Sequence, residues 1–260
     1  MTEIPIYQVD AFTSALFSGN PAAICPLKQW LPDDQLQAIA AENNLSETAY
    51  FVRDGERYHL RWFTPGCEVD LCGHATLASA YVLFNELGEN GDLLRFQTKS
   101  GELLVKRHGD LLALNFPARP PSAVPANAGL VEALSGKPQE VLGARDYLVR
   151  YGTEDEVRAL NPNMEALKQI DRFAVIVTAR GTDCDFVSRF FAPAKGVPED
   201  PVTGSAHCTL IPYWAEKLGK TTLHARQVGR RGGELFCKLN GDRVEMAGHA
   251  ALFLRGTIQL

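Results

Sequence analysis

Two stretches of the chain decide the fold: GELLVKRHGDLLAL at Gly101–Leu114 and GELFCKLNGDRVEM at Gly233–Met246. They align without a gap, and six of the fourteen positions are identical. Each alternates apolar and polar residues on both sides of a short turn, expected at His108-Gly109 and at Asn240-Gly241, which is typical of a β-hairpin with one buried face. The two stretches start at residues 101 and 233, about half of the 260-residue chain apart, so they indicate an internal duplication.

A second matched pair lies upstream of each hairpin. The sequence RWFTP at 61–65 resembles RFFAP at 189–193, and an acidic loop follows each of them. A glycine then opens the next segment, as Gly73-His74-Ala75 in the first half and Gly204-Ser205-Ala206 in the second. Two matched pairs in the same order make a chance resemblance unlikely. Each half is therefore predicted to hold strands, an acidic loop, a helix and a hairpin.

The two central helices are predicted over His74–Leu87 and Ser205–Leu218, each followed by a glycine. The first is apolar on nearly every side, which is typical of a buried helix, and Pro212 should bend the second. These patterns predict an α+β fold of two pseudo-symmetric lobes. Each lobe is a curled, mostly antiparallel, barrel-like sheet wrapped around a central buried helix.

The lobe boundaries follow from a proline-rich stretch and from the tail. Prolines at 117, 120, 121 and 125 indicate a linker, and residues 250–260 form a strand-like tail with no repeat partner. We therefore expect residues 1–116 plus 248–260 to form the first lobe and 117–247 the second. Peripheral helices are predicted at 33–44 and 164–170.

Composition excludes several classes of protein. The chain is 45% hydrophobic and 22% charged, with 26 Lys and Arg against 31 Asp and Glu, for a net charge of −5. This balance argues against nucleic-acid binding, and no segment has the length and apolarity of a membrane span or a secretory signal. We expect a cytoplasmic protein with six reduced cysteines. Without C-x-x-C, H-E-x-x-H or G-x-G-x-x-G, we expect no metal and no dinucleotide cofactor.

The starts of the two central helices are candidate anion-binding sites, because the first N–H groups of a helix have no partner within it. Two such ends that face each other across a cleft would bind a substrate carboxylate. Gly73 and Gly204 would supply N–H groups, with His74 and Ser205 beside them and Asp200 just before the second helix. Each of these polar residues also has an ordinary interpretation: Ser205 as a helix N-cap, Asp200 as a turn former before Pro201, and His74 as a satisfied buried histidine.

Glu47 is the candidate base. It stands in Asn-Leu-Ser-Glu-Thr, in the loop before a strand expected over Thr48–Val52. It is either a solvated loop acid or, if the strand points it inward, a general acid and base.

Three motifs together resemble the PhzF family of phenazine-biosynthesis-like proteins: NLSET at 44–48, DLCGHAT at 70–76 and EDPVTGSAH at 199–207. The openings VDAF at 9–12 and GNPA at 19–22 resemble that family too. The resemblance covers essentially the whole chain. It implies the diaminopimelate-epimerase-like fold, a homodimer and no cofactor.

The resemblance also implies an activity, the isomerisation of trans-2,3-dihydro-3-hydroxyanthranilate by a glutamate that moves a proton between ring carbons. By motif, that glutamate is Glu47. His74 and Asp200 would hold polar groups of the substrate and assist the proton shift. Ser205, with the N–H groups of Gly73 and Gly204, would hold the carboxylate.

Two alternatives stay open. The related epimerases use one cysteine from each lobe, and Cys72 stands where one such thiol would be, but its counterpart before Gly204 is Thr203. The position that matches Glu47 in the second half is expected near Phe173. The chain could instead be an epimerase or racemase of a small amino or hydroxy acid, or a non-catalytic homologue that binds a small molecule.

Overall fold

The computed structural model describes residues 3–125 and 128–260 of the chain. It divides into two compact units. We call Met1–Asn115 with Ala247–Leu260 the N-terminal unit and Phe116–Met246 the C-terminal unit. Each is described by itself.

The N-terminal unit contains half of the described strands and one buried helix. Its strands are β1 (Glu3–Ala11), β2 (Asn20–Leu27), β3 (Glu47–Asp54), β4 (Arg57–Phe63), β5 (Glu68–Val69), β6 (Leu93–Thr98), β7 (Gly101–His108), β8 (Leu111–Pro117) and β18 (Ala250–Gln259). Its helices are α1 (Asp33–Asn43) and α2 (Gly73–Tyr81), and α2 continues into a π-helical turn, η1 (Val82–Glu86). The C-terminal strand β18 pairs with β1, so the tail of the chain completes this unit.

The C-terminal unit repeats this arrangement with more peripheral helices. Its strands are β9 (Ser122–Ala123), β10 (Glu140–Gly143), β11 (Tyr147–Arg150), β12 (Val175–Arg180), β13 (Phe186–Ala192), β14 (Val197–Asp200), β15 (Thr222–Gln227), β16 (Gly233–Asn240) and β17 (Arg243–Gly248). Its helices are α3 (Ala128–Leu134), α4 (Glu154–Ala159), α5 (Met164–Leu167), the short 3₁₀ turn η2 (Pro193–Lys195) and the central α6 (Gly204–Leu218).

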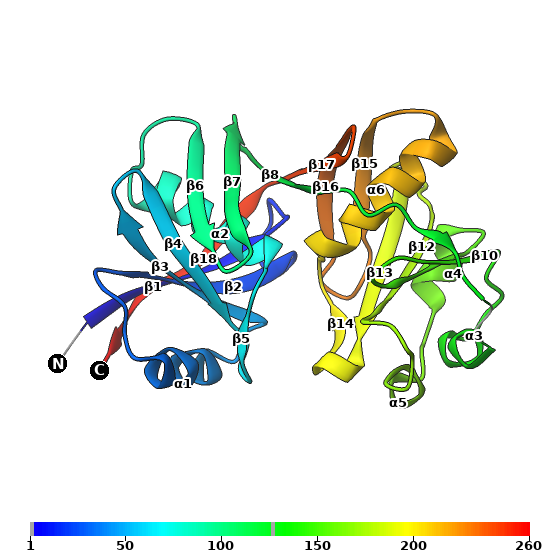
Figure 1. Cartoon of the computed structure of the whole chain (residues 1–260), viewed down its shortest axis with the longest axis horizontal. Coiled ribbons are helices and arrows are strands. Elements are labelled where there is room, and N and C mark those ends of the chain that lie inside the picture. Colours follow the sequence, from blue (N-terminus) through cyan, green and yellow to red (C-terminus); the bar gives the residue numbers. More distant parts are fainter. Residues whose placement is uncertain (1–2, 126–127) are drawn as a thin grey trace. The chain divides into compact units, whose positions relative to one another are not determined.

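The order and direction of strand pairing are the same in the two units. In the first, β1, β2, β3, β4, β6 and β7 pair in that order as antiparallel, parallel, antiparallel, parallel and antiparallel neighbours. In the second, β10, β11, β12, β13, β15 and β16 pair with the same alternation. The predicted α+β fold is thereby confirmed, and its duplication is visible in the topology. Figure 1 shows each sheet curling beside its helix, and the sheets stay open rather than closing into barrels.

The central helix of the N-terminal unit is buried almost completely. Seven of the nine residues of α2 are buried, from His74 to Ala80. Such a helix fits the all-round apolar pattern of the sequence. One detail differs from the single helix that was predicted. The last turn is wound as a π-helix, with the Leu87 N–H donating to the Val82 carbonyl at 3.0 Å. Apolar periodicity does not distinguish a wide final turn from an ordinary one.

The two repeated hairpins turn one residue later than the sequence suggested. β7 ends at His108 and β16 at Asn240, so the two-residue loops are Gly109-Asp110 and Gly241-Asp242. Both glycines have positive φ, 62° and 63°, which a type II′ turn requires at its first loop residue. The Asn-Gly pair was therefore a correct hairpin signal with the wrong placement.

The two predicted peripheral helices are present, but each ends earlier than predicted. The peripheral helices end at Asn43 and Leu167, rather than at 44 and 170. Within residues 3–125 and 128–260, no helix combines the length and apolarity that crossing a membrane requires.

A strained loop leads from β1 into β2. Phe12 and Phe17 have φ of 62° and 68°, values that are uncommon outside glycine, and Phe12 is fully buried. The Phe17 N–H donates to the buried Asp10 carboxylate at 3.1 Å. Gly19 closes the loop at φ 67°, and a Cβ there would lie 2.3 Å from the Ala11 carbonyl oxygen. The loop thus needs glycine for conformation and for space.

Gly19→Ala should therefore destabilise the protein much more than Gly88→Ala. Gly88 has nearly the same φ, 71°, but a Cβ there would meet nothing within 4 Å. Strain alone should cost Gly88→Ala about 1–2 kcal/mol. The backbone collision should bring Gly19→Ala to about 3 kcal/mol or more. Urea unfolding of both variants measures the difference, and equal losses would show that the close approach to Ala11 is not what requires glycine.

Candidate active site

Glu47 is the first residue of β3, so its prediction as a loop residue was wrong by one position. Asn44 ends α1 in the left-handed conformation, and the Asn43 side chain donates to the Thr48 hydroxyl at 3.0 Å. These contacts fix the start of the strand. β3 runs parallel to β2 with Ala22 opposite Glu47.

His74 is the second residue of α2, and its ring lies between two polar side chains. Nε2 is 3.0 Å from Glu47 Oε2, and Nδ1 is 3.2 Å from the amide nitrogen of Asn20. Asn20 lies two residues before Ala22 on β2, which brings it to the same end of the β2–β3 pair as Glu47. In a neutral ring, with the Asn20 amide nitrogen as donor, Nδ1 accepts and the ring proton sits on Nε2, directed at Glu47, whereas a charged ring carries a proton on both nitrogens.

Cys72 completes this group. It is the N-cap residue of α2, it is buried, and its Sγ is 3.5 Å from His74 Nδ1. We call Asn20, Glu47, Cys72 and His74 the Glu47 cluster. Glu47 and His74 were predicted from the sequence to have roles in the site. Asn20 was not, although it is the second residue of the GNPA motif at 19–22.

The electrostatics of the Glu47 cluster favour a charged imidazole. Burial by itself would lower the pKa of His74, but the negative charges that Cys72 and Glu47 can carry outweigh it, and the pKa of His74 is raised well above its usual value. Burial raises the pKa of the Cys72 thiol to about 11. The Cys72 thiol is therefore protonated at neutral pH.

The predicted residues of the C-terminal unit form a second group. Asp200 ends β14, and the hydroxyl of Thr203, the N-cap residue of α6, donates to its carboxylate. The buried Gln227 of β15 holds this loop from behind. Its amide donates to the Asp200 carbonyl at 2.6 Å and accepts from the Thr203 N–H at 2.9 Å.

Ser205 is the second residue of α6 rather than its N-cap, so the interpretation as an ordinary capping residue was wrong. Its Oγ accepts a hydrogen bond from Arg145 Nη2 at 3.0 Å. Arg145 is held in turn by two hydrogen bonds to the buried Asp146, at 3.0 and 2.9 Å. We call Arg145, Asp146, Asp200, Thr203 and Ser205 the Ser205 cluster. Arg145 was not among the site residues predicted from the sequence.

The internal repeat explains why Arg145 lies beside Ser205. In the parallel β11–β12 pair, Tyr147 lies opposite Val175, as Ala22 lies opposite Glu47 in the β2–β3 pair. Arg145 is two residues before Tyr147, just as Asn20 is two residues before Ala22. Asn20 and Arg145 each contact the second residue of the central helix of their own unit. An alignment of the two halves that included the starts of β2 and β11 would have matched Arg145 with Asn20.

The register of the β11–β12 pair also shows which residue of the C-terminal unit matches Glu47. The matching position is Val175, not one near Phe173, and Val175 is fully buried. Cys72 and Thr203 are the matching N-cap residues, as the sequence indicated. Both have extended backbones, and neither side chain caps its helix. The N–H groups of Gly73 and Gly204 therefore lie at helix starts of the kind that binds anions.

A second buried histidine serves as a contrast to His74. His207 is fully buried in α6, its Nδ1 lies 2.8 Å from the Thr203 carbonyl, and its ring packs against Phe186. Burial without a neighbouring charge lowers the pKa of His207 to about 4. It is therefore a neutral structural residue, unlike His74.

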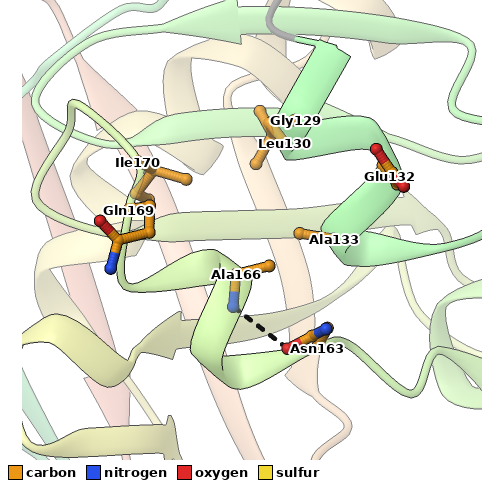
Figure 2. Close-up of a pocket in the computed structure, with 8 residues that line it drawn as sticks. All are labelled: Gly129, Leu130, Glu132, Ala133, Asn163, Ala166, Gln169 and Ile170. Atoms are coloured by element: carbon orange, nitrogen blue, oxygen red, sulfur yellow. Dashed lines mark hydrogen bonds between the residues drawn. The ribbon is translucent and has the colours of Figure 1, made fainter.

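A pocket of about 380 Å³ also lies in the C-terminal unit, between α3 and α5 (Figure 2). It is lined by Gly129, Leu130, Glu132, Ala133, Asn163, Ala166, Gln169 and Ile170. The Asn163 side chain is occupied as the N-cap of α5, where it accepts from the Ala166 N–H at 3.1 Å. Glu132 is the one titratable residue of this lining, so the pocket lacks the paired groups of the Glu47 cluster.

Comparison with known proteins identifies the family. The family model for phenazine biosynthesis-like proteins (PhzC-PhzF) matches residues 9–256. The chain therefore belongs to the PhzF family. An uncharacterized isomerase of Pseudomonas aeruginosa is 56% identical over 259 residues, which cover 99% of this chain and all of that protein. Consistent with such relatives, this PhzF-family chain is an isomerase.

Solved structures agree with the family and with the wider fold. A PhzF-family protein of Enterococcus faecalis superposes with a TM-score of 0.98 at 46% identity, covering 100% of both chains. A hydroxyproline epimerase of Agrobacterium vitis superposes with a TM-score of 0.62 at 10% identity, covering 98% of this chain and 92% of that one. The second likeness shows that the fold is shared with epimerases.

The charge on His74 should depend on Glu47. In the unaltered protein, His74 should titrate above 6.5, whereas in Glu47→Gln the carboxylate is lost, Cys72 remains, and the pKa of His74 should be lower than in the unaltered protein. Because the raised pKa favours the folded state, its stabilising contribution is complete below about pH 6.5 and is lost as pH rises through the folded-state pKa. Nitrogen-15 NMR titration of the imidazoles measures both values. His207 is the internal control and should stay neutral above pH 5 in both proteins. The same pKa for His74 in both proteins would contradict the ion pair between His74 and Glu47.

Proposed function

We propose that this isomerase moves a proton on a small carboxylate-bearing substrate, without a cofactor, and that Glu47 is its general acid and base. The observation that supports this most is the contact between Glu47 and His74. A carboxylate held 3.0 Å from an imidazole nitrogen, with its side chain only 18% exposed, is largely removed from bulk water. Such a group can take a proton from a substrate carbon and return it to another.

The chemistry needs no further reactant. In the first step the bond between a substrate carbon and hydrogen breaks, the proton goes to the Glu47 carboxylate, and the electron pair moves into the conjugated system of the substrate. In the second step the Glu47 carboxyl, whose proton exchanges with solvent, gives a proton to a different carbon. The product is an isomer of the substrate, and Glu47 is again a carboxylate. His74 would stabilise the carboxylate form of Glu47 before the first step and after the second.

The Ser205 cluster suits the recognition of an anion. We propose that the Ser205 hydroxyl and the N–H group of Gly204 bind the substrate carboxylate. Arg145, which already donates to Ser205, adds a fixed positive charge at that hydroxyl. The parts that the family resemblance gives to Gly73, His74 and Asp200 in holding the substrate stay predictions.

A two-base racemase is the second candidate, because the epimerase fold is shared. The repeat argues against it. A racemase of that kind needs matching bases from both halves, but the counterpart of Cys72 is Thr203 and the counterpart of Glu47 is Val175. Neither threonine nor valine supplies an accessible base at neutral pH. One acid-base residue in one unit fits an isomerase better.

The proposed substrate is trans-2,3-dihydro-3-hydroxyanthranilate or a related compound, which carries the carboxylate and the conjugated ring that this chemistry needs. A homodimer and a cytoplasmic location stay predictions of the family resemblance.

Glu47→Gln should stop proton transfer while leaving the protein folded. We expect turnover of trans-2,3-dihydro-3-hydroxyanthranilate in deuterated water to fall by at least about a hundredfold, the usual share of a general base. Mass spectrometry follows deuterium entering the product. Glu42→Gln, which removes an exposed carboxylate from α1, is the matched control and should keep full activity. Retained turnover in Glu47→Gln would reject Glu47 as the base, and an inactive unaltered enzyme would reject this substrate.

Ser205→Ala should mainly weaken substrate binding. The loss of one charge-assisted hydrogen bond should cost about 1–3 kcal/mol, seen as a rise in KM with a smaller change in kcat. Ser122→Ala, at an exposed position of the same unit, is the control. An unchanged KM would remove Ser205 from the binding site.

A further inference from the structure

Two positively charged side chains of the C-terminal unit lie over one exposed aromatic ring. Arg145 Cζ is 4.4 Å and Lys195 Nζ 5.2 Å from the centre of the Phe173 ring, and Phe173 is 42% exposed. We propose that Arg145, Phe173 and Lys195, called here the Phe173 subsite, bind a second anionic group of the substrate, beside the carboxylate at Ser205. The substrate is then a dianion, with a second carboxylate or a phosphate. This inference rests on the proposed function, because it names the substrate class of the same site.

The register of the parallel strands places Arg145 beside Phe173. β11 and β12 pair with Tyr147 opposite Val175, and Arg145 and Phe173 each stand two residues before that pair. They therefore lie opposite each other where the two strands begin. The guanidinium reaches across to the ring from this position, in a cation–π contact.

Lys195 comes to the same ring from the other side of β12. β13 runs antiparallel to β12, with Phe191 opposite Val175, so β13 ends beside the start of β12. The turn η2 follows β13 and ends at Lys195. Three segments of the chain thus bring the members of the Phe173 subsite to one end of the sheet.

Arg145 has donors to spare for a ligand. Its Nε and Nη2 donate to Asp146, and Nη2 also donates to Ser205. Within the residues that the structure describes, the N–H groups on Nη1 have no protein partner, and the side chain is 33% exposed. Since the Ser205 oxygen accepts from Arg145, its own O–H can donate to a carboxylate. Two neighbouring donors, Nη1 and the hydroxyl, are therefore available to anionic oxygens.

The charge of Lys195 is not balanced by a nearby acid. Its side chain is exposed, and in the described part of the chain no carboxylate lies within ion-pair distance of its ammonium group. Asp146 is held by Arg145, and Glu199 by Arg189 at 2.7 Å. Asp146 offsets the charge of Arg145, so Lys195 gives the Phe173 subsite a net positive charge.

Both cations can act on one anion. Because both contact the same ring, they lie within about 10 Å of each other, roughly one Debye length at 0.1 M salt. The negative face of an aromatic ring attracts cations, and its positive edge can meet an anionic oxygen. A guanidinium with a free nitrogen also matches the oxygens of a carboxylate or a phosphate.

The matching positions of the N-terminal unit carry no positive charge. By the register of β2 with β3, and by the match between RWFTP at 61–65 and RFFAP at 189–193, they are Asn20, Leu45 and Cys67. An amide, an alkyl group and a thiol do not attract an anion in the way that a guanidinium and an ammonium group do. Recognition of the second anion is therefore assigned to the C-terminal unit alone.

Isothermal titration with four ring acids tests the Phe173 subsite. Anthranilate has one carboxylate, 2-aminoterephthalate and 2-aminoisophthalate have two, and 3-phosphooxyanthranilate has a carboxylate and a phosphate. The unaltered protein should bind at least one dianion about tenfold more tightly than anthranilate, the usual share of a charge-assisted hydrogen bond. The preference should shrink when salt is raised from about 0.05 to 0.5 M. The dianion that binds best shows whether the second group is a carboxylate or a phosphate.

Four variants assign the preference to its residues. Lys195→Met should reduce it by about three- to fivefold, as expected for an exposed charge, and leave the affinity for anthranilate unchanged. Phe173→Leu should reduce it because the cations lose the ring that holds them. Arg145→Lys keeps the charge but loses the planar fork, so it should weaken binding of both kinds of acid, and of the dianion more. Lys168→Met, at an exposed lysine of the same unit, is the matched control and should change nothing.

The outcomes separate the Phe173 subsite from the proposed function. Equal affinity for acids with one and two anionic groups, no binding of any of the four, or a preference that survives both Lys195→Met and Arg145→Lys would overturn the subsite. Thermal unfolding confirms that the variants are folded. The four acids are aromatic and undergo no proton shift between ring carbons, so the titration does not depend on turnover. Retained turnover in Glu47→Gln would reject the proposed base and leave the binding preference to be judged by itself.

Discussion

The burial of a central helix inside each curled sheet constrains everything else in this protein. α2 exposes almost none of its side chains, because the sheet of its own unit covers it on nearly all sides. A helix buried in this way can meet a ligand only at an end. Its first turn carries His74 and the N–H of Gly73, and the strands that surround it bring Glu47 and Asn20 to that same turn. The position of the Glu47 cluster is thus a consequence of how the core is packed.

The duplicated scaffold carries different chemistry in its two copies. At matching positions the N-terminal unit has Asn20, Glu47, Cys72 and His74, and the C-terminal unit has Arg145, Val175, Thr203 and Ser205. The first set can exchange protons, and the second suits an anion, because it combines a fixed guanidinium with a hydroxyl at a helix start. The backbone is conserved within the chain while the two sets of side chains have diverged. This division argues for an asymmetric isomerase over a symmetric racemase.

Two buried histidines show how strongly neighbouring groups decide charge. His74 and His207 both stand near the start of a central helix, and burial acts on both in the same direction. Cys72 and Glu47 beside His74 reverse that effect, whereas His207 has a backbone carbonyl and an aromatic ring for neighbours. The pKa of the first is therefore raised, and the second fills the core as a neutral ring.

The sequence by itself determined the duplication, the α+β class, the central helices and the family, because periodicity, turn signals and family motifs are local properties of the chain. It misplaced the hairpin turns by one residue and placed Glu47 in a loop, because the exact end of a strand depends on its partner. It missed Arg145 and gave Asn20 no role. Those two residues owe their positions to the register of parallel strands, β11 with β12 and β2 with β3. Parallel register joins segments far apart in the sequence, so only the tertiary structure could decide which side chains reach His74 and Ser205.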